Sequence, residues 1–95
     1  MRKAEREHLN KVAELGCIVC RNEGFLDSPA EIHHIGNGAT SKKSSHYESI
    51  PLCHCHHRTG GHGLAVHAGK KTWEAKFGTE KELLKQTLEL IDVIP

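Results

Sequence analysis

Apolar residues recur at helical spacing in three segments of the chain, residues 2–15, 70–77 and 80–93. Gly16 and Gly78 follow the first two segments, and glycine commonly ends a helix because it adopts left-handed backbone angles without strain. The pattern therefore predicts one helix near the N-terminus and two near the C-terminus.

The last two predicted helices supply most of the expected core. Trp73 and Phe77 lie four residues apart and so share one helix face. Thr79 and Glu82 have the spacing of a capping box, in which each side chain bonds the backbone N–H of the other at a helix start. The apolar positions expected to join the core from the last helix are Leu83, Leu84, Leu88, Leu90, Ile91 and Ile94.

Between these helices, short extended runs alternate with polar loops. Residues 31–35 form a β-type run, and residues 49–52 lead into a second cysteine motif. Glycine, asparagine, serine and proline indicate loops at 21–29 and 36–45. A short helix is expected to begin near His54.

The composition predicts one small domain with a thin core. The chain has 95 residues, 37% of them hydrophobic, with one Trp, one Tyr and two Phe. Small domains bury too little surface to be comfortably stable, and metal ions commonly make up the difference. The formal net charge of +1 excludes a uniformly basic surface, so DNA affinity must come from local charge clusters or from a metal.

Four cysteines in a short secreted chain would suggest disulfides, but three features favour reduced thiols. The charged N-terminal residues are followed by no apolar signal core, and no stretch is long enough to cross a membrane. The cysteines are also interleaved with histidines at ligand spacing. We therefore expect a cytoplasmic protein with free cysteines and no membrane association.

Nine histidines and four cysteines crowd the chain, and most fall into one ordered series. Thiolate and imidazole bind zinc and similar ions near neutral pH. Cys17 and Cys20 are three residues apart, as are Cys53 and His56, and this spacing is typical of zinc knuckles. These four residues are the predicted structural zinc site, with Cys55 as a rival for the fourth position.

The remaining histidines exceed what one structural site needs and allow a second, open metal site. His33 and His34 lie on the extended run, His57 directly follows the second knuckle, and His62 and His67 come soon after. Catalytic metals keep a position free for water or substrate, and a neighbouring histidine can act as a general base because its ordinary pKa is about 6.5. Strand alternation would put the two adjacent histidines on opposite faces.

The order of these residues resembles that of the HNH nuclease family, whose core is a β-hairpin followed by a helix around one metal ion. Its zinc-bearing members run Cys-x2-Cys, an Asp-His or His-His strand, an Asn or substitute, and a Leu-Cys-x2-Cys/His-His segment. The corresponding parts here are residues 17–20, 32–35, 46–48 and 52–57.

The chain is more similar still to the phage recombination enhancement function (Ref) family of RecA-dependent nucleases. The matching stretches are residues 31–35, 50–53, 56–61, 67–70, 73–74 and 77–78. The resemblance implies a small α+β fold, forming a single HNH-like nuclease domain over residues 1–95. An HNH-type β-hairpin and helix would form its metal core, with a zinc knuckle and flanking N- and C-terminal helices.

The resemblance also implies roles for the histidines. His33 and His57 would bind the catalytic metal, and His34 would be the general base that takes a proton from the attacking water. The middle Asn of the HNH name has no evident counterpart, and His46, with Glu48 behind it, is the candidate for its place.

The third ligand of the catalytic metal departs from the family pattern. The family's next ligand lies about one helical turn after His57, where this chain has Gly61. His62 or His67 must therefore substitute, and His67 is favoured because it lies within a matching stretch.

The implied reaction is hydrolysis of DNA phosphodiesters with one divalent ion, Mg²⁺, Mn²⁺ or Zn²⁺, beside a structural Zn²⁺. The family implies a RecA filament on single-stranded DNA as partner, and a phage or prophage protein acting in recombination in a bacterial host. Little base readout is expected, because no helix is rich in Arg, Asn and Gln. The candidate phosphate contacts are Lys42, Lys43, Arg58, Lys70 and Lys71.

Two other functions remain open at this point. A non-catalytic zinc module that binds nucleic acid or protein would account for the cysteines but would leave the other histidines unexplained. A metal-storage or metal-sensing domain would bind several ions without hydrolysis. The sequence does not distinguish nicking from double-strand cleavage, nor does it set the oligomeric state or the preferred DNA structure.

Overall fold

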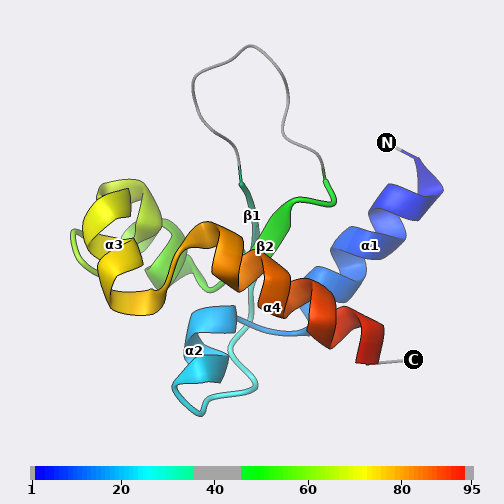
Figure 1. Cartoon of the computed structure of the whole chain (residues 1–95), viewed down its shortest axis with the longest axis horizontal. Coiled ribbons are helices and arrows are strands. Elements are labelled where there is room, and N and C mark those ends of the chain that lie inside the picture. The colour runs from blue at the N-terminus through cyan, green and yellow to red at the C-terminus, as the bar shows by residue number, and fades with distance from the viewer. Residues whose placement is uncertain (1, 36–45, 94–95) are drawn as a thin grey trace.

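Two short antiparallel strands lie at the centre of the fold, and helices surround them (Figure 1). The computed structural model describes residues 2–35 and 46–93. In chain order the elements are α1 (Lys3–Glu14), α2 (Ile18–Asn22), β1 (Glu31–His34), β2 (Ser49–Leu52), η1 (Cys55–Thr59), η2 (Val66–Ala68), α3 (Lys70–Phe77) and α4 (Glu80–Val93). This is the predicted small α+β fold, and the predicted bounds of α1, α3 and α4 agree with it to within one residue.

The hairpin carries a buried strand and a half-exposed one. Its paired residues are Glu31 and Leu52, Ile32 and Pro51, His33 and Ile50, and His34 and Ser49. Every residue of β2 is buried, and α1, α2 and α4 all pack against this strand. Pro51 is tolerated because both strands of a two-stranded sheet are edge strands, where a missing N–H is least costly.

The main core cluster draws residues from α2, β2, η2, α3 and α4. The buried cluster consists of Cys17, Ile18, Val19, Ile50, Leu52, Val66, Trp73 and Leu83. Trp73 is fully buried, and its ring lies 5.6 Å from that of Phe77, which confirms that these two residues share a face of α3. Because Cys17 belongs to the core, the predicted zinc site and the hydrophobic core are continuous.

A sharp turn links α1 to α2. Gly16 ends α1 as predicted, with a φ of 75°, and a Cβ there would lie 3.0 Å from two carbonyl oxygens of the following loop. Both the backbone angle and the space therefore require glycine. The predicted loop over 21–29 begins two residues late, because Arg21 and Asn22 continue α2.

The start of α4 is capped as the sequence predicts, but one core position is wrong. Thr79 Oγ1 accepts from the backbone N–H of Glu82 at 3.1 Å, and Glu82 Oε1 accepts from that of Thr79 at 2.9 Å. Leu83 is 3% exposed, whereas Leu88 is 38% exposed and is not a core residue. The buried stripe continues through Thr87, and the next residue lies about 100° further round the helix.

Some sequence predictions fall outside the described residues, namely those on Lys42, Lys43 and Ile94. Within the described ranges, no helix has the length and apolar character needed to cross a membrane.

Candidate metal centres

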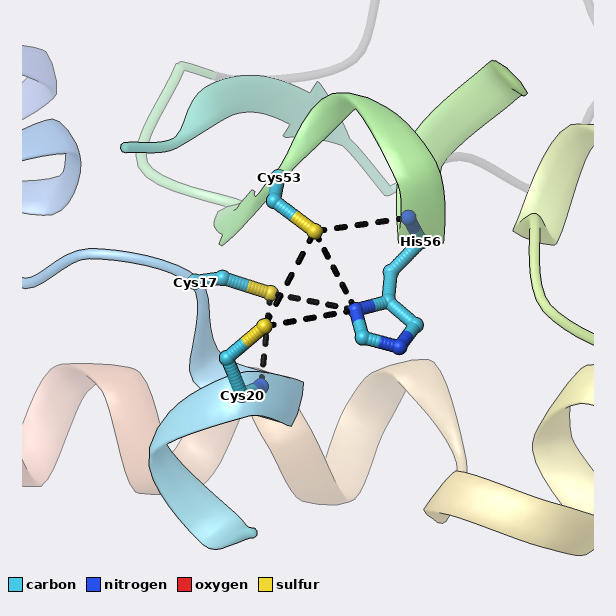
Figure 2. Close-up of side chains that lie close together, drawn as sticks. All are labelled: Cys17, Cys20, Cys53 and His56. Carbon is cyan, nitrogen blue, oxygen red and sulfur yellow. Dashed lines mark hydrogen bonds between the residues drawn. The ribbon is translucent and has the colours of Figure 1, made fainter. Parts of the chain in front are cut away.

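Four side chains from two separate stretches of the chain point toward one another (Figure 2). Cys17 and Cys20 lie at the start of α2, and Cys53 and His56 lie between the end of β2 and the first turn of η1. Their ligand atoms all lie within 4.8 Å of one another. The structure thus brings together the four residues predicted as the structural zinc site, although Cys20 and Cys53 are 33 positions apart.

The spacing of these atoms fits a tetrahedral ion. The sulfurs of Cys20 and Cys53 lie 3.8 Å apart, and His56 Nδ1 lies 3.6 Å from Cys17 Sγ, 3.6 Å from Cys20 Sγ and 3.2 Å from Cys53 Sγ. Zinc with ordinary bond lengths and tetrahedral angles separates two sulfurs by about 3.8 Å and a sulfur from a nitrogen by about 3.6 Å. The four cysteines of the chain form no disulfide and are free to act as ligands.

Backbone geometry and burial also suit a cation at this cluster. The N–H of Cys20 donates to Cys17 Sγ at 3.4 Å, and the N–H of His56 donates to Cys53 Sγ at 3.5 Å, as expected of knuckles. Burial, together with the charge of the neighbouring Cys53, raises the pKa of the Cys17 thiol to about 12. A bound divalent cation deprotonates a coordinating thiol outright, so a metal would supply the charge that this buried site lacks.

Cys55, the rival for the fourth position, packs elsewhere. It is absent from the cluster among the described residues, and a Cβ on Gly60 would lie 2.8 Å from its sulfur. His56 occupies the position instead, with its ring 5.1 Å from that of Phe77. Burial lowers the pKa of His56, which favours the neutral imidazole that a metal requires.

A second cluster joins His33 of β1, His57 of η1 and His67 of η2, with ligand atoms within 4.8 Å of one another. The Nε2 atoms of His57 and His67 lie 3.0 Å apart, and the His33 ring centroid lies 5.1 Å from each of the other two. Two nitrogens held about 2.1 Å from one ion at the right angle of octahedral coordination would be about 3.0 Å apart, so the residues fit a metal ion.

Of the two alternatives for the third ligand position, the structure brings His67 to the cluster. His62 turns back on its own segment, where its Nδ1 lies 3.2 Å from the carbonyl oxygen of Ala68. Burial lowers the pKa of His67, and the nearby His57 and His33 lower it further.

One ring of the cluster is held by a carboxylate that the sequence predictions missed. Glu31 Oε1 lies 2.8 Å from Nδ1 of His57. The same carboxylate accepts three hydrogen bonds from Arg58, from Nε at 2.9 Å to Oε1 and 3.2 Å to Oε2, and from Nη2 at 2.5 Å to Oε2. The hydrogen bonds from Arg58, then that from His57, lower the pKa of Glu31 to about 2. Glu31 lies two residues before His33, so strand alternation places both side chains on the same face of β1, and this pattern could have identified Glu31 from the sequence.

Glu80 holds a second ring of the cluster and was also missed. Its Oε2 lies 2.5 Å from His33 Nε2, and its Oε1 accepts from Lys70 Nζ at 3.1 Å. Burial raises the pKa of Glu80, but the hydrogen bonds from His33 and Lys70 outweigh burial and leave this pKa below its ordinary value. No sequence pattern links Glu80 to His33, from which it is separated by 47 positions.

His34, the predicted general base, lies on the other face of β1. His33 is 6% exposed and His34 is exposed, as strand alternation predicts. His34 Nε2 lies 2.9 Å from Nδ1 of His46, the candidate for the middle position of the HNH motif. Burial lowers the pKa of His34, and His46 and His33 lower it further, so the ring is held neutral near pH 7.

Among the candidates for phosphate contact that the structure describes, some are already in ion pairs and one is not. Arg58 is paired with Glu31, and Lys70 is paired with Glu80. Lys71 is exposed and forms no ion pair with any residue in the described ranges. Lys42 and Lys43 lie outside these ranges.

The fold and the first cluster define a small α+β protein whose Cys3His group could hold a structural metal ion. Residues 2–92 match the sequence model of the family described as recombination enhancement, RecA-dependent nuclease, and the chain belongs to this family. The resemblance to the RecA-dependent nucleases is thereby confirmed, and the family's name points to a nuclease that acts in recombination. A comparison with curated proteins found no match.

Proposed function

We propose that this protein is a metal-dependent DNA endonuclease of the HNH type, formed by residues 1–95 as one domain and dependent on RecA. The observation that carries the proposal is the convergence of His33, His57 and His67 from three different elements, separate from the cysteine cluster. A non-catalytic zinc module has no need of a second, histidine-only group, and a storage domain has no need of the hydrogen-bonded pair of His34 and His46.

The two clusters have different tasks in this proposal. The cluster of Cys17, Cys20, Cys53 and His56 offers four ligands and would hold a structural Zn²⁺. The three-histidine cluster offers only three, which leaves positions for water and phosphate, as catalytic sites require. When bound there, Mg²⁺, Mn²⁺ or Zn²⁺ would stabilise the negative charge that develops on the phosphate and on the leaving oxygen.

His34 and His46 would supply the proton transfer. Because His34 lies on the other face of β1 from His33, this role requires the metal and the phosphate to lie at the edge of the hairpin. An Nε2–H of His34 donated to His46 Nδ1, 2.9 Å away, leaves His34 Nδ1 with a lone pair for the proton of the attacking water. Once His34 is protonated, the same hydrogen bond stabilises its positive charge, so His46 orients the base and stabilises its charged form. The lowered pKa of His34 keeps this base unprotonated at neutral pH.

DNA contacts in this proposal come from the phosphate backbone. Lys71 is available as it stands, with Lys42 and Lys43 as further candidates, whereas Arg58 and Lys70 would first have to leave their carboxylate partners. The site would therefore show little sequence preference by itself. Targeting would come from a RecA filament on single-stranded DNA in the cytoplasm of a phage-bearing bacterium.

The test is cleavage of plasmid and single-stranded DNA with Mg²⁺ or Mn²⁺, with and without RecA and ATP. Loss of a general base lowers the rate by about 10²- to 10⁴-fold, so His34→Ala should remove cleavage while zinc content stays unchanged. His62→Ala is the matched control, because this histidine lies in the same region but outside the cluster. Cleavage by His34→Ala at the wild-type rate, or no cleavage by wild type under any condition, would refute the proposal.

A further inference from the structure

Glu80 is an unusual residue for the start of a helix, because its carboxylate is buried. The residue is 5% exposed, and both of its oxygens have partners, His33 Nε2 at 2.5 Å and Lys70 Nζ at 3.1 Å. A buried carboxylate is costly unless it is paired and hydrogen-bonded. The arrangement therefore joins β1, α3 and α4 at one ring of the three-histidine cluster.

We propose that Glu80 is the positioning residue of the three-histidine centre, which fixes the ring of His33 and selects its tautomer. This inference rests on the proposed function, since it assigns His33 to a metal. An ionised carboxylate only accepts hydrogen bonds, so the proton of a neutral His33 must lie on Nε2. The lone pair then lies on Nδ1, which becomes the nitrogen that can bind a cation.

The surroundings of Glu80 are built to hold it in this place. Its own backbone N–H donates to Glu74 Oε2 at 2.8 Å, so a side chain from the middle of α3 fixes the first residue of α4. Lys70, the first residue of α3, donates to the second carboxylate oxygen. The lysine is half-exposed, and its charge is used to hold a carboxylate rather than left free for a phosphate.

Removal of the carboxylate would loosen the centre in two ways. His33 would lose its only acceptor on Nε2 among the described residues and could take either tautomer. Lys70 would keep its positive charge near the cluster without a counter-charge, which disfavours a cation. Loss of such a partner typically weakens metal affinity by about 10- to 100-fold.

The first measurement is Co²⁺ binding by isothermal titration calorimetry to protein already loaded with one equivalent of Zn²⁺. Glu80→Ala should weaken Co²⁺ binding by about 10- to 100-fold, and Glu80→Gln, whose amide oxygen can still accept the bond, by less. Glu89→Ala is the matched control, an exposed glutamate on the same helix, and should bind Co²⁺ as wild type does. Equal affinity in all four proteins would overturn the positioning role.

A second measurement needs no Co²⁺ and does not depend on any variant folding. Nitrogen-15 NMR of zinc-loaded wild-type protein should show His33 protonated on Nε2 and not on Nδ1. A proton on Nδ1 would overturn the inference. Wild-type protein that takes up one metal ion only would refute the proposed catalytic centre, whereas the tautomer would still decide whether Glu80 orients His33.

Discussion

Replacement of Cys17 by serine should unfold the protein, because it removes a ligand and a core residue together. Cys17 is 1% exposed, belongs to the buried cluster and contributes one of four ligand atoms. Apparent binding free energies of structural zinc are about 10–16 kcal/mol at pH 7, and domains of this kind are stable by about 5–15 kcal/mol in total. Loss of most of the zinc-binding free energy therefore leaves the folded protein with little or no net stability.

The chain provides a matched control in Cys55→Ser. This substitution changes the same atom in a cysteine that packs beside Gly60 and lies outside the cluster. Cys55→Ser should lower the free energy of unfolding by about 1 kcal/mol, the typical cost of a single substitution. For a domain of this size about 1 kcal/mol lowers the melting temperature by about 4–8 °C.

Thermal melting by circular dichroism, with zinc content measured in parallel, separates the two variants. Wild type and Cys55→Ser should each hold zinc and lose their cooperative melting transition when a strong chelator is added. Cys17→Ser should hold less than one equivalent and show no cooperative transition with or without chelator. Similar melting of both variants, unaffected by chelator, would refute the structural role of the metal.

Two further predictions concern the backbone and a surface ion pair. Gly16→Ala should destabilise the protein by about 1–3 kcal/mol, because φ is 75° at this position and a Cβ would lie 3.0 Å from two carbonyl oxygens. Chemical denaturation measures the loss of stability, and an unchanged unfolding midpoint would contradict the prediction. The Glu31 carboxyl should titrate near pH 2, so the stability it contributes is present above its ordinary value of 4.5 and is lost as pH falls toward 2. Arg58→Ala should raise this pKa toward its ordinary value, as carbon-13 NMR titration would show, and a midpoint near pH 4.5 in wild type would rule out the ion pair.

The elements that could be predicted from sequence are those with short-range signals. The capping box of Thr79 and Glu82 and the glycine stop at Gly16 depend on residues at most a few positions apart, and the structure has both. Leu88 shows the limit of periodicity, because an apolar residue one position off the buried stripe looks like a core residue in the sequence. Thr87 holds that place instead, with its hydroxyl bonded to the carbonyl oxygen of Leu83 at 2.7 Å.

In the candidate metal centres, too, the residues with short-range sequence signals could be predicted and those without could not. The knuckle spacing of the cysteines is a local pattern, and the structure brings those residues together. The carboxylate behind His33 is not local: Glu80 reaches His33 because α4 packs against the hairpin. Charged residues at helix starts are common, so nothing in the sequence separates Glu80 from an ordinary solvated glutamate.

One short element couples the two centres. His56 and His57 are adjacent in η1, yet the first belongs to the cysteine cluster and the second to the three-histidine cluster. The turn is wide, with the N–H of Gly60 donating to the carbonyl oxygen of Cys55 at 3.0 Å, and a Cβ at Gly60 would lie 2.5 Å from that oxygen. An ion on His56 would therefore fix the backbone that aims His57, so loss of the structural metal should disorder the second centre without any change to its own ligands.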